Sequence, residues 1–226
     1  MESKKIYYHY CSVETFFNIM QTSTLRLGNP LSMNDYSEVI WFLKLIKNYA
    51  DKKWIYQNIS EKWFLIESII KDITQEIEFP YILCLSKKND VLSQWRSYAD
   101  DGKGVAIGIN VDNLLKFSNL LSGNEIIYEP QKQIEIINNK NIDGFLDEIE
   151  REFLNNNIKN LHNKVRTLIS HLLTEAVVCK NPKFQEEDEY RILCNPVDFN
   201  PEERKISRVK FRTNYICLFD YLFISS

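Results

Sequence analysis

The order of helical and β-rich segments is the feature that most constrains the fold of this chain. Residues 145–178 place apolar side chains at helical spacing, and so do residues 39–46 and 54–73. β-branched and aromatic residues gather instead near the two ends, at 6–10 and across 189–224. Because helices cluster between β-rich ends and do not alternate with single strands, we expect an α+β protein.

Short strand-like segments are expected to join into one sheet. The run 81–86, which follows Pro80, is continuously apolar and suits a buried central strand. Gly104 and Gly108 lie in another strand-like run and permit close backbone approach. No linker rich in Pro, Gly or Ser divides the chain. We therefore expect residues 1–226 to form a single domain with a mixed, mostly antiparallel sheet core and a helical layer. The remaining expected strands are 24–27, 124–128, 189–194, 206–212 and 215–224.

Composition excludes several classes of protein. With 44% hydrophobic and 26% charged residues in 226, the chain is globular and not disordered. Its 28 Lys and Arg face 31 Asp and Glu, so no general basic field favours broad binding of nucleic acid. The five cysteines show no zinc-ligand spacing, and no apolar run nears the roughly 18 residues of a membrane span. We expect a cytoplasmic protein with reduced cysteines, no metal and no membrane partner.

Common catalytic motifs are missing from the sequence. It contains no glycine-rich phosphate loop, no GxSxG and no HExxH. Most kinases, other nucleotide triphosphatases, α/β-hydrolases and zincins are thereby excluded.

Two segments carry side chains suited to a small ligand. His9 lies inside the first expected strand among three tyrosines, and its imidazole can donate and accept hydrogen bonds near neutral pH. A core imidazole with one satisfied hydrogen bond explains the same pattern. Trp95, Arg96 and Tyr98 share a short expected helix, where aromatic faces suit a planar ligand and Arg suits phosphate. An amphipathic helix that docks Trp95 into the core is the alternative.

A third segment groups acidic residues at the start of a late strand. In strand geometry Glu187 and Glu189 share one face, and Arg191 lies next along it. Carboxylates about 7 Å apart repel each other, which is a common way to prepare a general base. A solvated acidic turn is the alternative interpretation.

Several stretches together resemble domain-of-unknown-function family 2971, a bacterial family. The resemblance runs from about residue 6 to 195, and its most specific part is the block from Gln94 to Gly108. Tyr36 departs from the family, which often has Pro at that point. The stretches that carry the resemblance are Tyr8-His9-Tyr10, Leu25 to Pro30, Asn34-Asp35 with Glu38, Cys84-Leu85-Ser86, Gln94 to Ala99 with Gly104 to Gly108, and Glu187 to Ile192.

The order of these stretches is also similar to the layout of ADP-ribosyltransferases. That resemblance implies NAD as substrate, with His9 holding ribose or phosphate and Glu189 or Glu187 catalytic. It implies further that Tyr98 or Ser86 contacts the nicotinamide side. Trp95 or Tyr98 would flank that ring, and Arg96 or Arg191 would meet phosphate. The acceptor would be an unknown macromolecule, in bacterial stress or phage defence.

Two other functions use the same residues. A non-catalytic module would bind a nucleotide or another small ligand in the same pocket. A metal-dependent nuclease would use Asp35, Glu38, Glu187 and Glu189, although no spacing among them enforces a shared metal.

Overall fold

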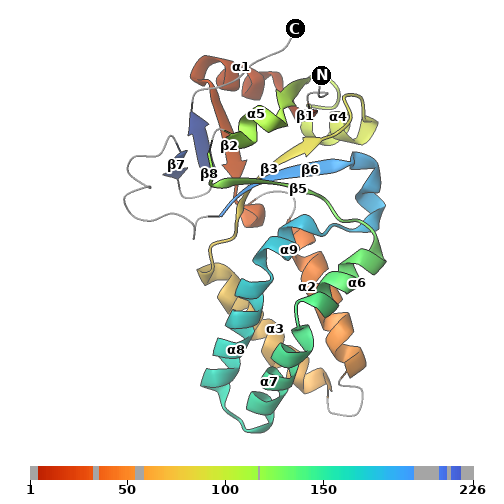
Figure 1. Cartoon of the computed structure of the whole chain (residues 1–226), viewed down its shortest axis with the longest axis vertical. Helices are drawn as coiled ribbons and strands as arrows, with labels where there is room; N and C mark the ends of the chain where they lie inside the picture. Colours follow the sequence, from red (N-terminus) through yellow and green to blue (C-terminus); the bar gives the residue numbers. More distant parts are fainter. Residues whose placement is uncertain are drawn as a thin grey trace. The chain divides into compact units, whose positions relative to one another are not determined.

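The computed structural model describes residues 5–32, 36–53, 59–116, 118–195, 209–212 and 215–219. They form two compact units. Unit 1 comprises Met1–Tyr36, Phe79–Ile126 and Asn181–Ser226, and unit 2 comprises Ser37–Glu78 and Ile127–Lys180. The described strands belong to unit 1, whereas unit 2 consists mainly of helices (Figure 1). The expected α+β class is confirmed. Each unit is assembled from segments far apart in sequence, which explains why no linker is visible.

Every strand pair in the described sheet is antiparallel, as expected for a mostly antiparallel core. The strands are β1 (Ile6–Cys11), β2 (Thr24–Gly28), β3 (Tyr81–Ser86), β4 (Val105–Asn110), β5 (Leu121–Glu125), β6 (Glu189–Cys194), β7 (Val209–Arg212) and β8 (Tyr215–Phe219).

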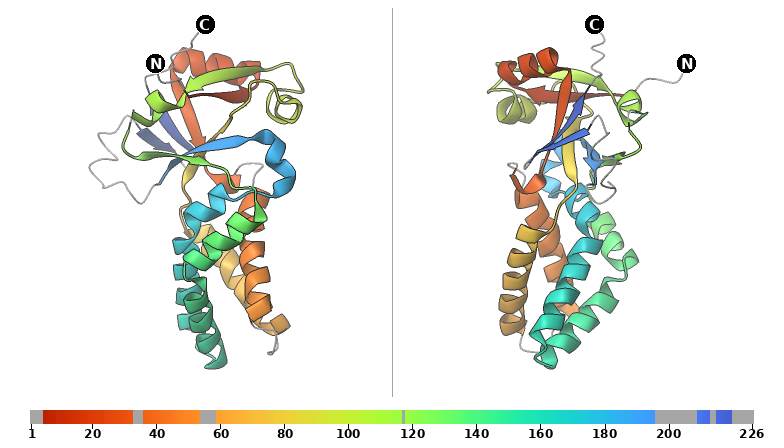
Figure 2. Two further views of the ribbon diagram at one scale, coloured as in Figure 1. Left: turned by 45° about the vertical axis from the view of Figure 1, so that its right-hand side comes forward. Right: turned by 90° about the vertical axis from the view of Figure 1, so that its left-hand side faces the viewer.

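The sheet branches at β3. One edge of β3 pairs with β6 along its whole length, from Tyr81 to Ser86. The other edge is shared, because β1 pairs at Ser86 and β2 pairs at Ile82. Strand β4 extends the β1 branch, and β8 and β7 extend the β2 branch. Figure 2 shows the two branches running in different directions from β3. The segment from Leu83 to Leu85 therefore lies between them.

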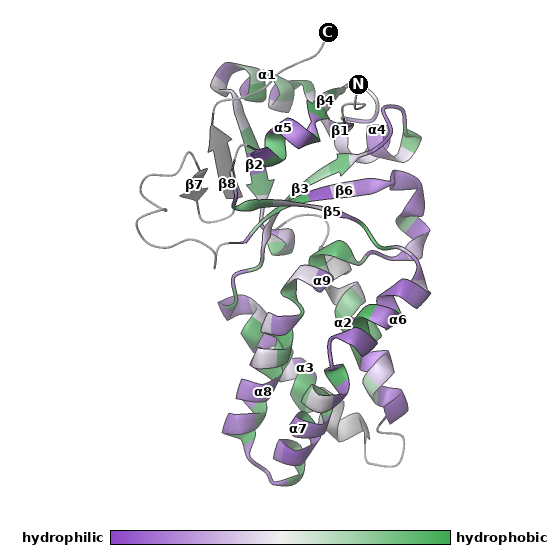
Figure 3. Cartoon of the chain, in the orientation of Figure 1, coloured by the Kyte–Doolittle hydropathy of each residue, from purple (hydrophilic) through white to green (hydrophobic). Residues whose placement is uncertain are grey.

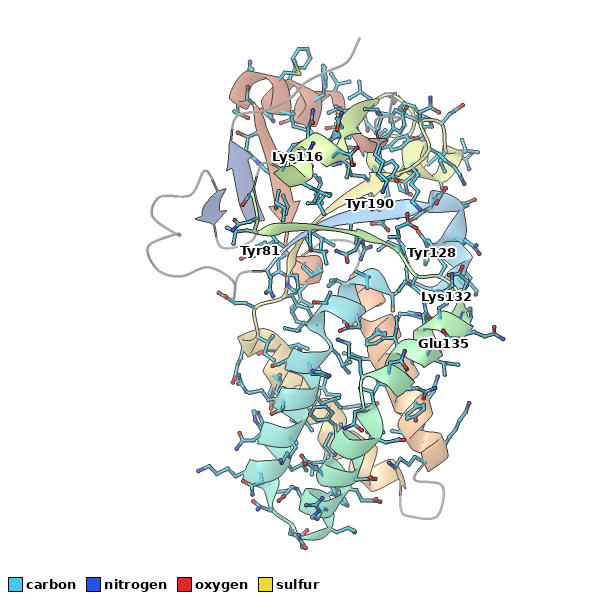
Figure 4. All side chains as sticks on the ribbon, viewed as in Figure 1. Tyr81, Lys116, Tyr128, Lys132, Glu135 and Tyr190 are labelled. Atoms are coloured by element: carbon cyan, nitrogen blue, oxygen red, sulfur yellow. The ribbon has the colours of Figure 1, made fainter. Side chains whose placement is uncertain are left out.

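Alternate residues of the sheet fill the core of unit 1. Leu83, Leu85 and Ile192 are at most 3% exposed. Tyr190, labelled on β6 in Figure 4, packs against Tyr7, with the two ring centroids 4.9 Å apart. Because neighbouring strand residues point to opposite faces, Glu189 and Arg191 lie on the other face of β6 from Tyr190.

Three helices accompany the sheet in unit 1: α1 (Val13–Thr22), α4 (Leu92–Tyr98) and α5 (Val111–Lys116). The expected cap of α1 is present, since the Ser12 hydroxyl accepts a 3.1 Å hydrogen bond from the Thr15 amide. Two short 3₁₀ helices, η1 (Pro30–Ser32) and η2 (Pro182–Glu187), complete the described part of this unit.

Unit 2 buries the apolar faces of amphipathic helices against one another. Figure 3 shows hydrophilic and hydrophobic residues alternating around α7 and α8. Phe42, Ile73, Leu161 and Val165 are at most 1% exposed. None of the described helices is both long and apolar enough to cross a membrane. The helices are α2 (Tyr36–Lys53), α3 (Ile59–Glu76), α6 (Pro130–Asn139), α7 (Ile142–Leu154), α8 (Ile158–His171) and α9 (Leu173–Val178).

Some segment boundaries differ from those expected. The helical stretch 145–178 is divided into α7, α8 and α9. The first break falls at three consecutive asparagines, where Asn156 adopts a left-handed φ of 52° and the Asn157 side chain caps α8. The strand expected at 124–128 ends at Glu125, and its pairing with β6 begins at Leu121. Residues 206–208 and 220–224 of the last two expected strands lie outside the described residues.

Gly104 should be required for packing the turn after α4 against β1. A Cβ there would lie 2.2 Å from the Cys11 carbonyl oxygen and 2.8 Å from the Ala99 Cα. We expect Gly104→Ala to lower the free energy of unfolding by about 2–3 kcal/mol, since backbone must move. At Gly108 the nearest atom is a side-chain methyl of Ile6, at 3.1 Å, so Gly108→Ala should cost under about 1 kcal/mol. Equal denaturation midpoints for the two variants would contradict this packing.

Candidate functional site

A cavity of about 110 Å³ lies where the sheet of unit 1 branches. It brings together His9, Tyr98, Glu187 and Glu189, four of the residues singled out in the sequence. Its other lining residues come from β1, β2, β3 and α4, and are Tyr10, Arg26, Gly28, Ile82, Leu83, Cys84, Leu85 and Gln94. Its volume suits one aromatic ring and part of a neighbouring group. Whole-cofactor sites are larger, roughly 300–1,000 Å³, so a larger ligand would extend beyond it.

His9 lies beside the part of β3 that faces the branch. Its Nδ1 is 3.4 Å from the carbonyl oxygen of Cys84. Because a carbonyl oxygen only accepts, this long contact assigns a proton to Nδ1 and leaves Nε2 of the neutral ring as an acceptor. Burial lowers the pKa of His9 below its ordinary value, and the contact with Cys84 partly opposes that effect. His9 is therefore neutral at pH 7.

One face of α4 lines the cavity. Gln94 and Tyr98 are four residues apart, so both side chains lie on the same side of the helix. Trp95 lies outside the lining, and its indole donates a 2.9 Å hydrogen bond to Asp90. Arg96 is exposed and also lies outside the lining. The structure thus places Tyr98 at the cavity. Trp95 and Arg96, the other two residues of this helix that were predicted to contact ligand, lie outside the cavity lining.

Tyr10 anchors the loop that leads into α4. Its hydroxyl donates to the carbonyl of Lys88 at 3.0 Å and accepts from the amide of Val91 at 3.2 Å. Its ring also meets Trp95 edge-to-face, with centroids 5.0 Å apart. Trp95 is thus a packing residue that orients α4, which fixes the face presented to the cavity.

Glu189 and Arg191 form a buried ion pair on β6. The guanidinium donates from Nε to Oε1 at 2.7 Å and from Nη2 to Oε2 at 3.1 Å. The two residues are 5% and 1% exposed, so this segment is not the solvated acidic turn of the alternative interpretation. The two-point contact with Arg191 orients the Glu189 carboxylate, which lines the cavity.

Glu187 reaches the cavity by a route that differs from the expected strand. Strand β6 begins only at Glu189, and Glu187 ends η2. Asp188 between them adopts a left-handed φ of 44°. The buried Ser86 hydroxyl donates to the Glu187 carbonyl at 2.8 Å and accepts from the Lys88 amide at 3.1 Å. Ser86 lies outside the cavity lining and positions the backbone of Glu187.

Arg26 and Gln94 are lining residues that were not predicted to contact ligand. Arg26 is the exposed residue between the buried Leu25 and Leu27 on β2. The sequence signal that could have identified Arg26 is a charged residue between two apolar residues of an expected strand. Gln94 belongs to the block from Gln94 to Gly108 that carries the family resemblance. The functional interpretation of this block was based on its aromatic residues and not on Gln94.

Among the described residues, no three His, Cys, Asp or Glu side chains are grouped so that they could hold a metal ion. Asp35, which the nuclease hypothesis requires, lies outside the described residues, and of Glu38 only the backbone is described.

His9 should make stability depend on pH. Below about pH 6.5 the unfolded chain binds a proton that folded His9 resists, so stability should fall as pH drops toward the lowered pKa. This contribution is fully present above about pH 7.5, and its slope is at most about 1.4 kcal/mol per pH unit. We expect His9→Asn, which retains a donor, to flatten the dependence of denaturation midpoints between pH 7.5 and 5.5. Equal slopes for the two proteins would contradict the assignment.

Comparison with known proteins identifies the segment that contains most of α4 and most of β6. Residues 94–192 match the family described as "Protein of unknown function (DUF2971)". No curated protein and no solved structure gives a significant match. The matched segment includes Gln94, Tyr98, Glu187, Glu189 and Arg191, so the resemblance drawn from the sequence is confirmed there. Residues 94–192 of the chain are thus similar to the DUF2971 family.

Proposed function

We propose that unit 1 binds NAD at the branch of its sheet and transfers ADP-ribose to an acceptor. The observation that supports this is the convergence of His9, Tyr98, Glu187 and Glu189 on one cavity. These residues come from the first strand, a central helix and the start of a late strand. They are the positions that the likeness to ADP-ribosyltransferases selects.

The acidic side of the cavity suits cleavage of the bond between nicotinamide and ribose. As that bond breaks, nicotinamide leaves with the bonding electrons and the ribose gains oxocarbenium character. Glu189 would accept a hydrogen bond from the ribose 2′-hydroxyl and face the developing positive charge. Arg191 fixes the orientation of this carboxylate. Glu187 supplies a second carboxylate at the same cavity.

The other lining residues would bind and orient the dinucleotide. The free acceptor position of neutral His9 suits a ribose hydroxyl, and the Tyr98 ring suits a face of nicotinamide. Arg26, which lines the cavity and is exposed, suits the phosphates better than Arg96, which lies outside the lining, or Arg191, which is 1% exposed.

We also propose that the reaction takes place in the bacterial cytoplasm, with a macromolecular acceptor and a role in stress or phage defence. A module that binds a nucleotide without turnover would use the same cavity, and the experiment below separates it from the transferase.

Removing the charge of Glu189 should slow turnover strongly while NAD still binds. We expect Glu189→Gln to slow nicotinamide release from NAD by at least about 100-fold, since a single transition-state contact of this kind contributes about 3 kcal/mol. The dissociation constant for NAD should change only a few-fold. Chromatography of released nicotinamide and calorimetric titration with NAD measure the two quantities.

A matched variant distinguishes loss of catalysis from loss of the fold. Glu189→Gln removes a carboxylate bonded to the buried Arg191, and breaking a buried ion pair destabilises proteins by several kcal/mol. Glu187→Gln keeps the ion pair and should slow release less than Glu189→Gln. Unfolding midpoints are recorded for both proteins. If NAD binds the wild-type protein and no nicotinamide is released, the transferase proposal fails in favour of the binding module. Failure of NAD to bind overturns both.

A further inference from the structure

Gln94 is a buried carboxamide without a hydrogen-bond partner among the described residues. The residue is 8% exposed and lines the cavity, and no hydrogen bond joins its side chain to another described residue. Its amide atoms are not among the described atoms that are sealed from water without a partner, so they are accessible from the cavity. A ligand in the cavity can therefore bond to this carboxamide.

The buried Gln133 of unit 2 shows how such a side chain is usually satisfied. Its Nε2 donates to the carbonyl oxygens of Ile127 at 2.6 Å and Lys180 at 2.8 Å. Its Oε1 accepts from the indole of Trp41 at 3.4 Å. Both ends of that amide are used within the protein, whereas Gln94 lines a cavity and makes no side-chain hydrogen bond to a described residue.

Gln94 is also held in place. Trp95, the next residue, is bonded to Asp90 and packed on Tyr10, which in turn accepts a hydrogen bond from Val91. These contacts determine which face of α4 turns to the cavity. The backbone of Gln94 is therefore held with its side chain on the cavity lining.

We infer that Gln94 recognises the carboxamide of a nicotinamide ring bound in the cavity. This inference rests on the proposed function and names the group that the cavity selects. A carboxamide presents a donor beside an acceptor and can pair with Gln94 through two opposed hydrogen bonds. Glu187 and Glu189 line the same cavity, and Arg191 offsets the charge of Glu189. A carboxylate substituent close to these two acids would be repelled.

The adenine ring of the same dinucleotide is a second source of a paired donor and acceptor. Free nicotinamide, nicotinic acid and adenosine are therefore tested separately with the whole chain. NAD is compared with its analogue that carries a carboxylate in place of the carboxamide. Calorimetry measures the dinucleotides, and ligand-observed NMR measures the weaker fragments.

We expect wild-type protein to bind the carboxamide compounds at least about tenfold more tightly than the carboxylates. Gln94→Met, of similar length and without the amide, should lose at least about tenfold for nicotinamide and NAD, so that the preference collapses. Gln94→Glu should give the same loss and serves if Gln94→Met does not fold. Ser97→Ala, on the exposed side of α4, is the control and should bind like wild type.

Each outcome decides the inference. Affinity for nicotinamide that is equal in wild type and both Gln94 variants overturns it, even if NAD is cleaved and the transferase proposal stands. Dependence on Gln94 for adenosine alone also overturns it and assigns the side chain to adenine. Dependence for nicotinamide in a protein that never cleaves NAD supports the inference while the transferase proposal fails.

Discussion

The shared edge of β3 is the constraint on which the site of unit 1 depends. One edge of this strand is paired with β6 from end to end, and the other is divided between β1 and β2. Buried backbone groups require partners, so the stretch between the branches needs something other than a strand. His9 supplies one such partner at the carbonyl of Cys84. The branch creates the cavity and also places an imidazole at its side.

The buried pair of Glu189 and Arg191 adds the second property of this cavity. Removing two charges from water costs free energy that their attraction repays only in good geometry, so such pairs are poor stabilisers of a fold. The two-point contact here meets that geometric requirement. Its attraction can therefore offset the cost of burial, and it holds a carboxylate in one orientation beside the cavity. Together with Glu187 it makes the cavity suited to a ring or sugar that carries positive charge.

Local patterns in the sequence predicted most elements of the fold. The apolar run of β3, the aromatic strand β1 and the cap at Ser12 depend on neighbouring residues only, and all three are confirmed. The points at which the helical stretch 145–178 divides were harder to predict. The apolar periodicity continues through Asn156, although this residue adopts a left-handed turn. Strand order was not predictable, because pairing between β3 and its three partners joins distant segments.

The candidate site was predictable in its parts but not in its assembly. His9, Tyr98, Glu187 and Glu189 were found from residue type and position, and the fold brings them to one cavity. Which side of α4 faces inward depends on the contact between Trp95 and Tyr10, so the sequence favoured Trp95 where Gln94 is the lining residue. Ser86 and Arg191 have the expected polarity, yet their partners are the backbone of Glu187 and the carboxylate of Glu189.

The most direct test of this account is a crystal structure with an NAD analogue whose ribose ring oxygen is replaced by methylene, which resists cleavage through an oxocarbenium ion. The account predicts density for the nicotinamide ring between β1 and β2, against the segment from Leu83 to Leu85, with the adjoining ribose near Glu189. Density for the analogue elsewhere on the chain, with only water in the cavity at the branch, would contradict it.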